Sequence, residues 1–284
     1  SAASDVYKRQ PITVPAQDMV LGLYYITKLR KGAKGEGLTF YGPEEALIAY
    51  NEGKVDIHAI VNVVVKDLDK DGKIVDVMMK ETSVGRVIVN EIVPAEVGYL
   101  NTIISKKSLR DIISDVIKAV GVARACEFLD GIKNLGYYMA FKGGLSFNLG
   151  DIIIPKEKEE LVKRGNEEVE QIMMNYNMGF ITDNERYNQV IDTWTHVNSD
   201  LSDILYKTIK NDDQGFNSVF MMLDSGARGS KEQIRQLSGM RGLMAKPQKA
   251  GAEGAQIIEN PILSNFKEGL SVLELSLIHI SEPT

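Results

Sequence analysis

The feature that most constrains how this chain can fold is a pair of seven-residue apolar repeats between residues 156 and 210. In the second half of that range, two series of apolar residues each recur every seven positions. The first series is Tyr187, Trp194 and Leu201, and the second, three positions further along the chain, is Val190, Val197 and Ile204. The first half repeats similarly through Val162, Val169 and Tyr176, with Ile172 between them and Gly165 where an apolar residue is expected. This spacing places each series on one face of a helix and is typical of a coiled coil.

The residues between the two halves predict a tight turn. Gly179 can end the first helix, because glycine readily adopts the left-handed conformation that often follows a helix. Thr182 and Glu185 have the spacing of a capping box, which starts a helix. Each helix would be roughly 30 Å or more in length at 1.5 Å per residue. We therefore predict an antiparallel coiled-coil hairpin over residues 156–210.

The residues before the hairpin predict both helices and strands. Apolar periodicity and a proline at a first helical turn indicate helices, and β-branched runs indicate strands. The predicted helices are 15–31, one that starts at Pro43, 105–120 and 123–141, the last two joined near Gly121. The predicted strands are 55–66 and 74–79, joined by a turn at 69–73. Residues 82–94 fit either a strand or a short helix.

Together these predictions give an α+β fold, in which a small strand-containing lobe is followed by a mainly helical region with a projecting hairpin. The predicted divisions are a mixed lobe at 11–100, a helical region at 101–155, the hairpin at 156–210 and further helices with a loop at 211–274. Residues 1–10 and 275–284 resemble translated sequencing-adapter read-through, and we predict that neither segment is native.

Cysteines, histidines and apolar runs exclude several classes of protein. Cys126 is the only cysteine, so no internal disulfide can form, which is usual for proteins of the reducing cytosol. With only three histidines as well, a zinc site of standard spacing is not expected. No apolar run approaches the ~20 residues that a membrane-spanning helix needs. We therefore predict a cytoplasmic protein that binds no metal of its own and makes no membrane contact.

Two short motifs suggest ligands but fit simpler interpretations better. Asp67, Asp69 and Asp71, followed by Gly72, match the first half of a calcium-binding loop, but Met78 occupies the position where a bidentate glutamate is required. The flanking residues also predict strands, so a solvated hairpin turn is the preferred interpretation. Glycines at 32, 35 and 37 do not have the spacing of a phosphate-binding loop and predict a surface loop instead.

A basic, glycine-punctuated stretch is the best candidate for contact with an anion. The whole chain has a formal charge of -6, but residues 225–249 carry six basic side chains and one acidic one. Gly226 and Gly229 allow the backbone to turn around Arg228, and Ser230 with Gln233 predicts a capped helix start just beyond it. A guanidinium beside a helix N-terminus can bind phosphate through two hydrogen bonds. The alternative is a capped helix preceded by a solvated arginine. No catalytic residues are predicted in the chain.

Eight longer segments occur in order from about residue 11 to 274: VPAQDMVLGLYY at 14–25, TSVGR at 82–86, EIVP at 91–94, ERYN at 185–188, DSGARGS at 224–230, QIRQL at 233–237, GMRGLMAKP at 239–247 and PIxxNFxEGL at 261–270. Together these segments resemble the largest subunit, β′, of bacterial DNA-directed RNA polymerase.

The resemblance implies template-directed RNA synthesis, in which Mg²⁺ ions align the RNA 3′ end and the incoming nucleoside triphosphate. It implies that this chain builds the funnel, or secondary channel, through which nucleotides reach the active site. The implied partners are the rest of β′, the β, α and ω subunits, channel-binding transcription factors, nucleoside triphosphates, and DNA and RNA in the intact complex. The implied location is the cytoplasm, in association with the nucleoid.

The resemblance also assigns roles to particular residues. Arg228 matches an arginine near the nucleotide triphosphate. The hairpin matches the rim helices, where regulators dock, and four consecutive residues fall on the docking region: Glu185, Arg186, Tyr187 and Asn188. Residues 235–258 resemble the F-loop, in which we single out Arg235, Met240, Arg241, Met244 and Lys246.

Three departures limit what this chain is expected to do alone. The family's aspartate loop, which holds Mg²⁺, precedes the matched segments, and its bridge helix and trigger loop follow them. We therefore expect the segment alone to be inactive and to bind no Mg²⁺. Residues 249–256 also form a longer stretch than the family's F-loop region. The alternative interpretation is a non-catalytic coiled-coil adaptor with a small β domain, which explains residues 156–210 but not the basic stretch.

Overall fold

The computed structural model describes residues 4–5, 10–11, 15–68, 74–245 and 257–281. These residues form two compact units. The first unit comprises residues 1–146 and 221–228, and the second comprises residues 147–220 and 229–284. Within the described residues, no helix is long and apolar enough to cross a membrane.

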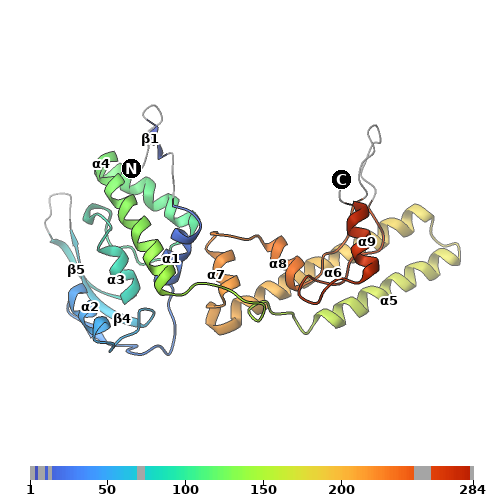
Figure 1. Ribbon diagram of the computed structural model, residues 1–284, viewed down its shortest axis with the longest axis horizontal. Helices are drawn as coiled ribbons and strands as arrows, with labels where there is room; N and C mark the ends of the chain where they lie inside the picture. Colours follow the sequence, from blue (N-terminus) through green and yellow to red (C-terminus); the bar gives the residue numbers. More distant parts are fainter. Residues whose placement is uncertain (1–3, 6–9, 12–14, 69–73, 246–256, 282–284) are drawn as a thin grey trace. The chain divides into compact units, whose positions relative to one another are not determined.

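The first unit contains a three-stranded sheet covered by short helices (Figure 1). Strand β4 (Ile60–Leu68) lies between β3 (Thr39–Phe40), to which it is parallel, and β5 (Ile74–Ser83), to which it is antiparallel. Val61, Val63 and Val65 alternate along β4 and are buried beneath α2 (Pro43–Asn51) and α3 (Val84–Asn90). The β4 and β5 strands confirm the predicted hairpin, whose aspartate-rich turn at 69–73 lies outside the described residues. The first unit also includes the short pair β1 (Ser4–Asp5) and β2 (Gln10–Pro11).

Residues 82–94, whose sequence fits either a strand or a short helix, contain the end of a strand and a short helix. Strand β5 ends at Ser83, and α3 begins at the next residue. The Ser83 hydroxyl caps this helix by accepting a hydrogen bond from the Arg86 backbone N–H at 3.3 Å. After α3, the 3₁₀ helix η1 (Ala95–Val97) leads toward the helical part of the unit.

Helices α1 (Asp18–Thr27) and α4 (Lys106–Lys142) form the second core of this unit. The α4 helix bends at Gly121, whose φ of 77° confirms the predicted junction between two helices. The two helices approach so closely that a Cβ at Gly22 would lie 2.0 Å from the Gly136 carbonyl oxygen. A Cβ at Gly136 would lie 2.5 Å from the Met19 carbonyl oxygen. Glycine is therefore required on both sides of this crossing.

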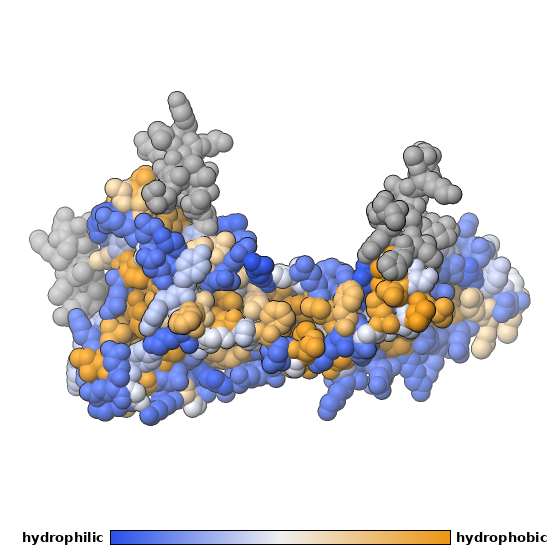
Figure 2. All heavy atoms as spheres, in the orientation of Figure 1, coloured by the Kyte–Doolittle hydropathy of each residue, from blue (hydrophilic) through white to orange (hydrophobic). Residues whose placement is uncertain are grey.

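The second unit is built around the predicted hairpin of α5 (Lys158–Asn177) and α6 (Asp183–Asn211), which lie side by side in Figure 1. Gly179 has a φ of 76° in the turn, and Thr182 and Glu185 form the predicted capping box. The remaining elements of this part of the chain are η2 (Asp212–Gly215), α7 (Ser218–Asp224), α8 (Lys231–Ser238) and α9 (Val272–Ser281). Helix α9 includes several residues of the predicted non-native end, and Figure 2 shows apolar side chains gathered over it.

The buried face of the hairpin follows the predicted register in α6 but differs from it in α5. Val190, Trp194, Val197 and Leu201 are at most 4% exposed, as the repeat on α6 predicts. On α5, Val169 and Ile172 pack against this core as predicted, but Leu161 is buried in place of Val162 and Tyr176 is 39% exposed rather than buried. The α5 residues in or against this core are Leu161, Val169 and Ile172, with the buried Gly165 between the first two.

Gly165 lies in the core at a position where the repeat predicts an apolar side chain. A Cβ at this position would lie 3.1 Å from both Trp194 Cζ3 and Val197 Cγ2, so the indole ring already occupies the space that a larger side chain would need. Glycine at this position therefore leaves room for Trp194 to pack against the α5 backbone.

We predict that Gly165→Leu lowers the free energy of unfolding of the hairpin by about 1–3 kcal/mol, because it overpacks the site of Trp194. This would occur even though leucine has a helix propensity about 1 kcal/mol better than that of glycine. Fluorescence of Trp194, the only tryptophan, during denaturant unfolding reports the effect. Glu168→Leu, on the exposed face of α5, is the matched control. A Gly165→Leu chain as stable as this control would contradict the packing described.

Candidate functional site

Arg228 lies in an exposed turn that follows α7 and is fastened to the start of α1. Its Nη2 donates a hydrogen bond to Gln17 Oε1 at 3.1 Å, and its backbone N–H donates to the Met222 carbonyl at 3.3 Å. Gly226, with a φ of 71°, provides the predicted turn. The capped start of α8 at Ser230 is also confirmed, but it belongs to the other compact unit. The hydrogen bond observed for the guanidinium is therefore to α1, not to α8.

Gln17 is the N-cap residue of α1 and has an unusual backbone conformation. Its φ is 52° and its ψ is -121°, and no side chain caps the helix by hydrogen bonding. The first N–H groups of a helix carry a partial positive charge and attract anions. The hydrogen bond to Gln17 holds the Arg228 guanidinium at this helix end, so two positive groups meet there, beside the Asp18 carboxylate of the first turn. Gln17 could not be predicted as a partner of Arg228, because no residue near it in the sequence indicates a contact 211 positions away.

The turn that carries Arg228 is anchored from two helices. Tyr24 Oη on α1 donates to Asp224 Oδ2 at 2.7 Å, and the Lys106 backbone N–H at the start of α4 donates to the Ser225 carbonyl at 2.9 Å. Lys28 is 7% exposed, with its Nζ 3.5 Å from Tyr24 Oη. Burial lowers the pKa of Lys28 to about 8, although the nearby Asp224 carboxylate acts in the opposite direction. These contacts fix the backbone from which Arg228 projects.

Residues 82–86 contact the other end of α1, the helix whose start is bonded to Arg228. The buried Arg86 guanidinium donates to the Thr27 carbonyl at 3.0 Å, and to the Asn101 carbonyl and side-chain oxygen at 3.1 Å and 2.9 Å. Burial holds the pKa of Arg86 below its usual range. A Cβ at Gly85 would lie 1.9 Å from the Ile26 carbonyl oxygen, which explains the glycine. The motif therefore positions the end of α1.

The four predicted docking residues at the start of α6 divide into an outward and an inward pair. Glu185 and Asn188 are exposed. Hydrogen bonds from Thr182 hold the pKa of the Glu185 carboxyl below its usual value. Arg186 and Tyr187 instead contact residues near the C-terminus of the chain, through hydrogen bonds to Glu259 and to Ile257.

The predicted F-loop residues occupy different environments. Arg235 pairs with Glu232 on α8, and Met240 is fully buried in the hairpin core. The Arg241 guanidinium carbon lies 5.5 Å from the centroid of the Phe266 ring. The Met244 carbonyl accepts a hydrogen bond from the Ile258 N–H at 2.8 Å. Lys246 lies outside the described residues.

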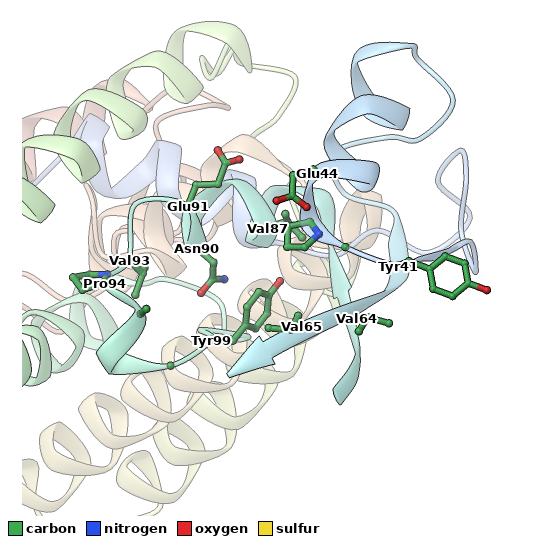
Figure 3. A pocket seen from close by; sticks show the side chains of 14 residues that line it. Tyr41, Glu44, Val64, Val65, Val87, Asn90, Glu91, Val93, Pro94 and Tyr99 are labelled. Carbon is green, nitrogen blue, oxygen red and sulfur yellow. The ribbon is translucent and has the colours of Figure 1, made fainter. Parts of the chain in front are cut away.

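A pocket of about 350 Å³ occupies the first unit between the sheet, α3 and η1 (Figure 3). Its walls are both polar and apolar, and two of its polar groups are already bonded: the Asn90 amide to the backbone of Arg86 and Leu100, and Tyr99 Oη to Thr82 Oγ1. In Figure 3, Glu44 and Glu91 lie at one edge and Tyr41 points away. The pocket could accept an apolar group with a positive charge, but it holds no catalytic constellation.

Metal-ligating side chains do not cluster in the parts of the chain that the structure describes. No group of three or more histidine, cysteine, aspartate or glutamate side chains there could hold a metal ion. Two candidate sites therefore remain, and each is described by itself: Arg228 with its anchors in the first unit, and the residues at the start of α6 in the second unit.

Comparisons with known proteins agree on one family. The family model for RNA polymerase Rpb1, domain 3, matches residues 7–152, and the model for Rpb1, domain 4, matches residues 181–267. The β′ subunit of DNA-directed RNA polymerase from Bacteroides fragilis (strain YCH46) is 88% identical over 264 residues, which are 93% of this chain and 18% of that protein. The β′ subunits of Parabacteroides distasonis and Flavobacterium johnsoniae are 76% and 57% identical, also over 93% of this chain, and the matches cover 18% and 19% of their lengths.

Proposed function

The chain belongs to the family of β′ subunits of bacterial DNA-directed RNA polymerase, and from this premise we propose that it forms part of the nucleotide-entry channel and the docking site for channel-binding factors. The chain spans 18% of the length of its Bacteroides relatives, so RNA synthesis is proposed for the whole assembly. In that assembly the chain would contact the rest of β′ and the β, α and ω subunits, in the bacterial cytoplasm and near DNA and RNA.

One observation carries the nucleotide-entry proposal: an exposed arginine held at a helix start by a fixed turn. Arg228 is bonded to the N-cap residue of α1, while Tyr24 and Lys106 fasten the turn before it. Guanidinium binds phosphate through two parallel hydrogen bonds. Arg228 therefore contacts the triphosphate of an entering nucleotide and orients it.

Mg²⁺ would be supplied by other parts of the full-length subunit. Mg²⁺ prefers carboxylate oxygens and nucleotide phosphates as ligands. No group of three or more side chains that could hold a metal ion lies among the described residues. We propose that this chain contributes to nucleotide binding and that Mg²⁺ is held elsewhere in the full-length subunit.

The docking proposal is carried by the outward pair at the start of α6. Glu185 and Asn188 are exposed on the side of the helix that does not hold the C-terminal segment. A partner with a positively charged or hydrogen-bonding side chain can reach them. Arg186 and Tyr187 have intramolecular partners, so we assign docking to Glu185 and Asn188 first.

We predict that Glu185→Lys combined with Asn188→Ala weakens regulation by channel-binding factors at least tenfold, because it reverses a charge and removes a hydrogen-bonding group at the interface. Basal transcription by the reconstituted polymerase should not change. Factor titrations in a transcription assay measure both quantities.

The matched control is Glu185→Gln, because glutamine keeps the capping box with Thr182 and removes only the charge. Comparing factor regulation in Glu185→Gln and in the double variant shows whether regulation is lost because the helix cap is lost or because the docking interface is changed. If the double variant responds to factors as the unmodified enzyme does, the docking assignment is wrong.

A further inference from the structure

The C-terminal part of the second unit contains a two-stranded backbone ribbon, here defined as residues 240–245 and 257–264. Isolated antiparallel bridges pair Gly242 with Ile262 and Ala245 with Ile257. Gly242 and Ile262 exchange backbone hydrogen bonds of 3.0 Å and 2.9 Å. Only a few such bonds hold the ribbon together, so its position depends on what it packs against.

One end of the ribbon is fixed in the core of the hairpin. Met240 and Ile262 are both 0% exposed, and Met240 belongs to the same apolar cluster as Trp194 and Leu201. A Cβ at Gly242 would lie 3.2 Å from Asn198 Nδ2, so the ribbon backbone passes directly over α6. This end is held by burial of apolar side chains.

The other end of the ribbon is held by polar contacts with the start of α6. Arg186 Nη1 donates to Glu259 Oε2 at 2.6 Å, and Arg186 Nη2 donates to Glu259 Oε1 at 3.0 Å, which is the two-bond fork of an arginine–carboxylate pair. Tyr187 Oη donates to the Ile257 carbonyl at 2.9 Å and accepts from the Ile257 N–H at 3.0 Å. Both polar groups of the Ile257 backbone are thus satisfied by one side chain.

These contacts differ from an ordinary surface ion pair. The Arg186 side chain is 11% exposed, and its guanidinium also bonds Asp183 Oδ1 at 3.0 Å and 2.8 Å and lies over the Tyr176 ring. The two carboxylates hold the pKa of Arg186 above its usual range. By contrast, the Arg164–Asp200 pair between α5 and α6 is more than half exposed on both sides, at 3.5 Å. Exposed pairs of that kind contribute little to stability.

We propose that Arg186 and Tyr187 are positioning residues, which hold the ribbon against the hairpin in the assembled polymerase and so set the rate of nucleotide addition. This proposal rests on the proposed function, because it takes the chain to form part of the nucleotide-entry channel of the whole enzyme, with the ribbon in the segment that resembles the F-loop. It goes further by giving the inward pair a role separate from docking. The start of α6 then presents Glu185 and Asn188 to partners and Arg186 and Tyr187 to the ribbon.

Hydrogen exchange in the assembled polymerase tests the contact itself. With full-length β′ carrying Arg186→Ala, amides of residues 257–262 should exchange about tenfold faster or more, because charge-assisted hydrogen bonds hold this segment. Tyr187→Phe keeps the ring packing, and it should accelerate exchange most at Ile257, whose N–H loses its acceptor. Arg164→Ala is the matched control and should change nothing. Unchanged exchange at 257–262 in both variants would overturn the proposal.

Kinetics of single-nucleotide addition on the same enzymes test the positioning role. Arg186→Ala and Glu259→Ala should each lower the maximal rate with little change in nucleotide KM, and the double variant should be no slower than the worse single one. Faster exchange with an unchanged maximal rate would equally overturn the proposal. Failure of the proposed function would be distinguishable, because it would leave the nucleotide KM of Arg228→Ala unaltered.

Discussion

Replacing Gly136 with alanine is expected to destabilise the first unit by about 3 kcal/mol or more, because the added methyl group would overlap the backbone of α1. A Cβ at Gly136 would lie 2.5 Å from the Met19 carbonyl oxygen, and a Cβ at Gly22 would lie 2.0 Å from the Gly136 carbonyl oxygen. Backbone atoms cannot move aside as the end of a flexible side chain can. The two helices would have to separate, which would open the core that contains Leu23 and Ile132.

The direction of this change in stability distinguishes close packing of α1 against α4 from the effect of helix propensity. In an exposed helix interior, alanine is more favourable than glycine by about 1 kcal/mol, so propensity alone predicts that Gly136→Ala stabilises the chain. Asn134→Ala, on the exposed side of the same helix, is the control and should change stability by no more than about 0.5 kcal/mol. Denaturant unfolding followed by far-ultraviolet circular dichroism compares the two. Equal stability of both variants would show that α1 and α4 do not cross at these glycines.

Elements governed by local rules could be predicted from the sequence. The capping box of Thr182 and Glu185 and the positive φ of Gly179 depend on residues a few positions apart, so the hairpin turn was predicted correctly. The same holds for Ser230 at the start of α8 and for Gly121 between the two parts of α4. Each of these features is decided by the backbone chemistry of one turn.

Contacts between distant segments could not be predicted in the same way. Apolar periodicity shows which face of a helix is buried but not which element covers it. Gln17 and Arg228 are 211 positions apart, and Arg186 and Glu259 are 73 apart. Gly165 shows the same limit within the hairpin: the repeat required an apolar side chain, but the size of Trp194 on the facing helix decided the outcome.

The candidate residues could be singled out from the sequence and stay predictions, whereas their contacts could not be predicted. Arg228 was singled out from the glycines and charge around it, but its hydrogen bond goes to the start of α1 rather than to α8. The docking segment was identified as four consecutive residues, and only the fold divides them into an outward and an inward pair. The assignment of these residues to the polymerase came from long motifs, because no local chemistry in the chain indicates RNA synthesis.

Arg228→Ala should produce the largest functional loss of any single substitution at the candidate site. A hydrogen bond to a charged group contributes about 1.5–3 kcal/mol, so losing the contact should raise the apparent KM for nucleotides by roughly tenfold to a hundredfold. Arg228→Lys should be intermediate, because lysine keeps the charge but lacks the planar fork. Arg110→Ala removes an exposed arginine from α4 in the same unit and is the matched control.

The most direct test of the nucleotide-entry proposal is the rate of single-nucleotide addition by reconstituted polymerase, measured across nucleotide concentrations for these three variants. We expect Arg228→Ala to slow addition most at limiting nucleotide, Arg228→Lys to recover part of the rate and Arg110→Ala to match the unmodified enzyme. If Arg228→Ala adds nucleotides at the unmodified rate even at limiting concentration, Arg228 does not contact the triphosphate and the proposed role in nucleotide entry is contradicted.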